Sequence, residues 1–104
     1  MGLPPLDKTP SALLSAHPGV NGTMITNWDT ILAATAKDFE NAHPGSNVFV
    51  FDTYSFLNGV LANAAQEHIT NTTAYCPSYA AADIGWNYAA YGCSPIYNYF
   101  WFSE

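Results

Sequence analysis

The stretch from Asn47 to Leu61 constrains the fold of this chain more than any other part of it. Val48–Phe51 is a continuous run of β-branched and aromatic residues, which is typical of a strand covered on both faces. From Tyr54 onward apolar residues recur at helical spacing, so the sequence predicts a helix directly after the strand. A strand of this kind belongs in a parallel sheet, and the chain contains no second stretch of comparable quality. We therefore expect an α/β fold of which this chain supplies only a part.

Two more helices are predicted before the strand. Thr9–Pro10 is suited to cap and begin a short helix. A longer helix follows, with Asn21 or Thr23 as its cap. Its apolar stripe is formed by Trp28, Ile31, Leu32, Thr35 and Phe39. The sequence Ala-His-Pro-Gly occurs at 16–19 and at 42–45. Both copies are interpreted as helix ends, because no third ligand stands at a metal-like spacing.

Composition excludes several functional classes. Only 10% of the residues are charged, against about 25% in ordinary globular domains. With two Lys, no Arg and a net charge of −6, the chain is a poor partner for nucleic acid. No apolar run approaches the roughly 20 residues of a membrane span, and Met1–Leu6 has none of the features of a signal peptide.

Four residues nevertheless indicate an extracellular protein. Asn21 and Asn71 each begin an Asn-x-Thr triplet, the acceptor sequence for N-glycosylation. Cys76 and Cys93 are the two cysteines of the chain, and a disulfide between them would constrain the unfolded chain by about 3 kcal/mol. The alternative is a pair of free, buried thiols.

From Thr70 onward, aromatic residues, Gly and Pro crowd one stretch, which predicts irregular structure with a short helix around Ala81–Ala90. Exposed aromatic rings such as Trp86 and Trp101 could stack on sugars. The alternative is that these rings pack onto the body of the domain. The first interpretation gives one candidate function, a non-catalytic secreted module that binds carbohydrate or protein through an aromatic, disulfide-stapled surface.

Motifs for catalysis are missing from the 104 residues. No serine lies in a Gly-x-Ser-x-Gly or Gly-Asp-Ser sequence, and the chain has no phosphate-binding loop and no zinc spacing. We therefore expect neither a metal nor a cofactor. Asp52, Thr53 and Tyr54 follow the predicted strand, at the end where α/β proteins bind ligands. They are candidates to line a substrate cleft, although Asp52 or Thr53 could instead cap the next helix.

Several segments, in this order, resemble the fungal GDSL-type (SGNH) esterases, in particular the secreted acetylesterases of carbohydrate esterase family 16. The segments are Leu3–Pro10, Met24–Leu32, Val48–Tyr54, Phe56–Leu61, Ile69–Thr73 and the region around Cys76 and Cys93. The resemblance covers essentially the whole chain. It implies a three-layer α/β/α sandwich and hydrolysis of acetyl or other short acyl esters, often on saccharides, without a metal.

The family's catalytic blocks have no counterpart in these residues. In such enzymes a Gly-Asp-Ser serine attacks the ester, Gly and Asn of two further blocks help form the oxyanion hole, and an Asp-x-x-His block supplies the base and the group that orients it. We expect residues 1–104 to be a single partial SGNH domain that lacks the N-terminal strands and the final catalytic block. Such a chain would be inactive by itself.

Overall fold

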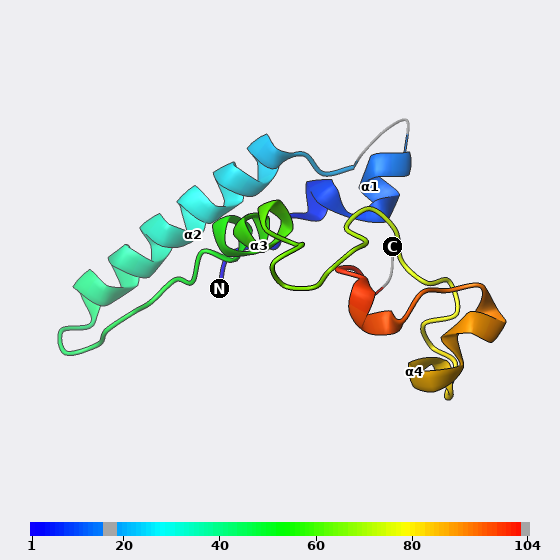
Figure 1. The fold of residues 1–104 in the computed structure, drawn as a ribbon. Helices are drawn as coiled ribbons and strands as arrows, with labels where there is room; N and C mark the ends of the chain where they lie inside the picture. Colours follow the sequence, from blue (N-terminus) through cyan, green and yellow to red (C-terminus); the bar gives the residue numbers. More distant parts are fainter. Residues whose placement is uncertain (16–18, 103–104) are drawn as a thin grey trace.

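The longest element of the computed structural model, which describes residues 1–15 and 19–102, is helix α2, Gly22–Ala42 (Figure 1). Asn21 caps it, because its side-chain oxygen accepts a hydrogen bond from the Met24 amide at 3.0 Å. At the other end the His43 ring stacks on Phe39 with 4.1 Å between ring centres, and Gly45 takes a φ of 94°. The predicted helix is confirmed, with Asn21 as its cap. No helix in the described part of the chain has the length and hydropathy to cross a membrane.

A short proline-rich segment precedes α2. It contains the 3-10 helix η1, Leu6–Lys8, and helix α1, Pro10–Leu14. Thr9 caps α1 as predicted, since its hydroxyl oxygen accepts from the Ala12 amide at 3.2 Å. Pro5 and Pro10 are fully buried, so the rigid rings pack into the fold. The predicted end of this helix, at the first Ala-His-Pro-Gly sequence, lies outside the described residues.

The prediction of a strand at Val48–Phe51 is wrong for this structure. Residues 46–52 run back along α2 as a stretched segment (Figure 1), yet they form no strand. A strand exists only where a neighbouring backbone supplies its hydrogen bonds. Among the described residues, segment 47–51 receives one such bond from elsewhere in the chain, from the Gly2 amide to the Phe51 carbonyl at 2.8 Å. The expected α/β sheet is therefore corrected to helices and irregular structure in the part of the chain that is described.

Helix α3, Thr53–Ala62, begins directly after the stretched segment, as the periodicity predicted. It is followed by a series of turns up to His68. His68 takes a φ of 59°, a left-handed conformation that is uncommon for residues other than glycine. Its amide donates to the Ala65 carbonyl at 3.3 Å, so His68 closes the turns that follow α3.

The C-terminal part has little regular structure, as predicted. Its elements are helix α4, Ile84–Asn87, and the 3-10 helices η2, Tyr88–Tyr91, and η3, Ile96–Asn98. Asn71 and Tyr99 form an isolated parallel bridge. Residues 70–72 and 98–101 are thereby joined, which brings the two ends of this region together.

The molecule is elongated and sparsely packed. Its radius of gyration is 17.5 Å, whereas a compact domain of this length has about 13 Å. Its accessible surface is 7071 Å², against about 5,700 Å² for a folded monomer of this mass. Among the described residues the buried hydrophobic side chains are Ile25, Ala64 and Cys76. Helices form, but they do not enclose one continuous core.

Candidate functional site

A hollow that contains Asp52 and Tyr54, two of the predicted cleft residues, lies between α2, the stretched segment and the start of α3. It has a volume of about 510 Å³. Thr26, Asp29 and Thr30 of α2 line one side. The other lining residues are Gly2, Ala33, Val50, Phe51, Asp52, Tyr54 and Ser55. The hollow thus combines carboxylates and hydroxyls with apolar side chains, and two of the three predicted cleft residues contribute to it.

Asp52 acts as the cap of α3. Its Oδ1 accepts a hydrogen bond from the Ser55 amide at 2.9 Å. Hydrogen bonds from the side chain and the backbone of Ser55 lower the pKa of Asp52, so the carboxylate is charged at neutral pH. The capping alternative of the sequence analysis is confirmed for Asp52, and the cap also fixes its direction at the edge of the hollow.

Thr53 lies away from the hollow. It is 8% exposed, and its hydroxyl has no hydrogen-bond partner among the described residues. A buried hydroxyl without a partner costs about 1–3 kcal/mol. Thr53 therefore lowers the stability of the described structure, because its hydroxyl is removed from water and gains no hydrogen bond in return.

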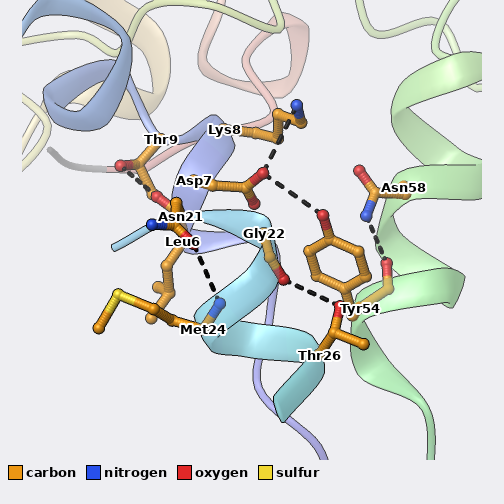
Figure 2. A network of polar contacts seen from close by, with 10 residues as sticks. All are labelled: Leu6, Asp7, Lys8, Thr9, Asn21, Gly22, Met24, Thr26, Tyr54 and Asn58. Carbon is orange, nitrogen blue, oxygen red and sulfur yellow. Dashed lines mark hydrogen bonds and ion pairs between the residues drawn. The ribbon is translucent and has the colours of Figure 1, made fainter. Parts of the chain in front are cut away.

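Tyr54 connects α3 to the N-terminal segment (Figure 2). Its hydroxyl donates to Asp7 Oδ2 at 3.3 Å, and the same oxygen lies 3.5 Å from Lys8 Nζ. A Cβ atom on Gly22 would lie 3.0 Å from the Tyr54 hydroxyl oxygen, so a larger residue there would require that hydroxyl to shift by a few tenths of an ångström. The Asn58 side-chain amide donates to the Tyr54 carbonyl at 2.9 Å. These contacts hold Tyr54 in place and give it a structural role in joining α3 to the N-terminal segment.

The structure brings Asp52 and Tyr54 to one hollow. Asp52 is bonded to Ser55 and Tyr54 to Asp7, and among the described residues neither is bonded to a histidine. His43 ends α2, with its Nδ1 2.9 Å from the Phe39 carbonyl oxygen, and His68 ends the turns after α3. In the described ranges no three His, Cys, Asp or Glu side chains are grouped as metal ligands. The role of Asp52, Thr53 and Tyr54 in lining a substrate cleft stays a prediction.

Cys76 and Cys93 form a disulfide, with an S–S distance of 2.02 Å and 5.6 Å between their Cα atoms. The alternative of two free thiols is therefore wrong. Cys76 is 2% exposed, so the bond is anchored in the interior of the C-terminal region. It closes a loop that contains α4 and η2.

The aromatic residues of the C-terminal region divide into two groups. Trp101 is half-buried; its Nε1 donates to the Thr72 carbonyl at 2.8 Å and its ring packs edge-on against Phe100. Trp86, Tyr97 and Phe102 are 76%, 76% and 71% exposed. Of the two tryptophans proposed for sugar stacking, the contacts of Trp101 are structural and the ring of Trp86 is accessible.

One polar cluster was missed by the sequence analysis. Asp83 accepts hydrogen bonds from the Asn87 side-chain amide and the Tyr91 hydroxyl, both at 2.7 Å. These bonds, that from Asn87 first, lower the pKa of Asp83, and the bond to Asp83 raises the pKa of Tyr91. The spacing of four residues between Asp83 and Asn87 within a predicted helix was the signal that could have indicated it.

Comparisons of the chain with protein-family models, with curated proteins and with solved structures find no match.

Proposed function

We propose that this chain is a scaffold part of a secreted SGNH-type ester hydrolase, whose complete form removes acetyl or other short acyl groups from saccharides. In that form a serine attacks the ester carbonyl, a histidine takes the proton of the serine, and an aspartate orients the histidine. In that complete form α2 and α3 would contribute to the helical layers, and segment 47–51 would pair with neighbouring strands that the described residues do not contain. The chain supplies none of the catalytic groups.

The observation that carries this proposal is the pattern of side-chain exposure along segment 47–51, together with its open backbone. Exposure alternates along it, because Val48 and Val50 are half-covered whereas Asn47, Phe49 and Phe51 are exposed. Such alternation with period two is that of a β-strand with one face packed. Phe49 is 91% exposed. A Val-Phe-Val-Phe sequence whose valines are half-covered, while its backbone and its phenylalanines are open, is suited to join a sheet.

Two further features support the same proposal. The described part of α2 exposes large apolar side chains, namely Met24, Trp28, Ile31 and Phe39, each at least 50% exposed. Large apolar side chains exposed along one face of a helix indicate a surface that another element covers. The buried hydroxyl of Thr53, at the end of the stretched segment, has no partner among the described residues. It would gain one where neighbouring strands end.

The first experiment is to sequence the transcript through both ends of the reading frame and to assay the purified 104-residue chain against an aryl acetate. We expect an in-frame Gly-Asp-Ser block upstream, an Asp-x-x-His block downstream, and no turnover by the isolated chain. Turnover that a serine-directed inhibitor abolishes would refute the scaffold role. A transcript that encodes only these residues would refute the esterase.

A second candidate function is favoured by the exposed aromatic rings of the C-terminal region. Trp86 and Tyr97 present most of their surface to solvent, and aromatic faces of this kind stack on sugar rings. In this alternative the chain is a non-catalytic secreted module that binds saccharides or a protein. Titration with acetylated xylo-oligosaccharides tests it: binding lost in Trp86→Ala and retained in Trp101→Phe supports the module, and absence of binding refutes the saccharide form.

A further inference from the structure

The two Asn-x-Thr sequences of the chain lie in different structural settings. We infer that Asn21 is an N-glycan acceptor throughout folding, whereas Asn71 is an acceptor only until residues 98–101 fold onto it. The inference uses the extracellular location that accompanies the proposed function, but not the esterase activity.

At Asn21 the glycan and the helix cap use different atoms. The cap uses Oδ1, which accepts from the Met24 amide at 3.0 Å. Within the described residues Nδ2, the atom that carries a glycan, donates no hydrogen bond, and Asn21 and Thr23 are both exposed. Among the described residues the hydrogen bonds of this triplet are those of the first turn of α2. Tyr54 and Asp7 approach only its middle residue, Gly22, and leave Asn21 and Thr23 exposed.

At Asn71 the triplet is bound by a segment far along the chain. The Asn71 amide donates to the Asn98 carbonyl at 2.9 Å, and the Phe100 amide donates to the Asn71 carbonyl at 2.9 Å. The Trp101 indole adds a bond to the Thr72 carbonyl. Asn71 Oδ1 also accepts from the Ala74 amide at 2.9 Å. An enzyme that must grip the backbone of the triplet has to act before these bonds form.

The chemistry is transfer of an oligosaccharide from a lipid-linked diphosphate sugar. The Asn Nδ2 forms a bond to the anomeric carbon and loses one proton. The bond from that carbon to the diphosphate oxygen breaks, and the lipid diphosphate leaves with the electron pair. The co-substrate and the transferase belong to the secretory compartment in which disulfides form.

The experiment expresses the full chain behind a cleavable signal sequence in a eukaryotic secretory host. Occupancy of each site is measured by mass spectrometry after enzymatic glycan release, which converts glycosylated Asn to Asp. Thr23→Ala and Thr73→Ala remove each acceptor sequence in turn. Thr23→Ala keeps the Asn21 cap, so loss of its glycan is separated from loss of the helix.

Two variants release residues 98–101. Trp101→Phe removes the indole hydrogen bond, and Cys76→Ser with Cys93→Ser removes the disulfide. Because glycan addition competes in time with closure of this region, both should raise Asn71 occupancy at least about twofold, with Asn21 occupancy unchanged. Tyr97→Phe, a change at a ring that is 76% exposed, is the matched control and should change neither site.

Three results would overturn the inference. They are an unmodified Asn21, an Asn71 as fully occupied as Asn21 in the parent chain, and an Asn71 occupancy that neither releasing variant increases. Failure of a variant to fold does not disturb the test, because an unfolded C-terminal region also leaves Asn71 accessible. The esterase proposal is unaffected by any of these results, since no activity is measured.

Discussion

The N-terminal region, residues 1–15 and 19–62, and the C-terminal region, residues 70–102, are ordered by different means. The N-terminal region consists of helices with side-chain caps, joined by a few polar contacts such as Tyr54 to Asp7. The C-terminal region has short helices only, and it is held by a disulfide and by backbone bonds between residues 70–71 and 98–100. Local sequence suffices to form helices but leaves apolar faces open, whereas long-range links order a segment that has little regular structure.

Removal of the disulfide should give the largest effect, a loss of stability in the C-terminal region that leaves the N-terminal region unchanged. Cys76 and Cys93 are 17 residues apart, and a loop of that size stabilises by about 3 kcal/mol. In the double serine variant the amides of Asn71 and Phe100 should exchange much faster with solvent deuterium, while those of α2 keep their protection. Equal loss of protection in α2 would show that the two regions fold as one unit.

Ile25→Ala should give the next largest effect, in the other region. Ile25 is fully buried, and truncation of a buried Ile costs about 2–5 kcal/mol. We expect about 2 kcal/mol of lost unfolding free energy, at the low end of that range, because the surrounding packing is sparse. The matched control is Ile31→Ala on the same helix, where the side chain is 65% exposed. A similar loss of unfolding free energy in that variant would contradict the exposure of Ile31 on α2.

Asn21→Ala should reduce the helicity of α2 by removing its cap. The expected cost is about 1 kcal/mol, seen as lower ellipticity at 222 nm and faster exchange of the Met24 amide. Asn21→Asp retains a capping oxygen and should behave like the parent chain. Equal losses in both variants would mean that the cap does not stabilise α2.

The smallest expected effect is a pH dependence of the turn from Asp83 to Tyr91. The lowered pKa of Asp83 means that its stabilising bonds are complete above the ordinary carboxyl pKa of about 4 and are lost as pH falls through the lowered value. The raised pKa of Tyr91 means that its bond is complete below about pH 10 and is lost as pH rises through the raised value.

Amide exchange across α4 and η2 measures this dependence. We expect a plateau at neutral pH with loss of protection at both extremes. Asp83→Asn keeps an acceptor for Tyr91 but cannot titrate, so its acid limb should disappear. An acid limb that persists in this variant would assign the dependence to another group.

The helices were predictable from sequence because their signals are local. Thr9–Pro10 and Asn21 capped the helices that follow them, and the stripe from Trp28 to Phe39 had the period of α2. Irregular structure after Thr70 followed from Gly, Pro and aromatic content, and the disulfide from the presence of two cysteines. These features depend on residues close in sequence or on very few pairings.

The strand was not predictable in the same way. Val48–Phe51 has the composition of a buried strand, but a strand depends on a partner backbone, which composition cannot supply. For the candidate site, the sequence predicted Asp52, Thr53 and Tyr54 together as cleft-lining residues. Asp52 and Tyr54 line the hollow, whereas Thr53 is buried and has no hydrogen-bond partner among the described residues. The sequence also did not indicate that Tyr54 binds Asp7. Those facts depend on how α3 meets the N-terminal segment, which local patterns do not encode.

The open backbone of segment 47–51 has a consequence for handling the protein. Asn47–Phe51 contains no charge and no proline, and short uncharged segments of high β-propensity stack into cross-β fibrils when exposed. The same surface that would receive a strand of its own domain can receive the same segment of another molecule. Aggregation should therefore rise steeply with protein concentration, and a charge at position 49, as in Phe49→Lys, should act as a gatekeeper against it.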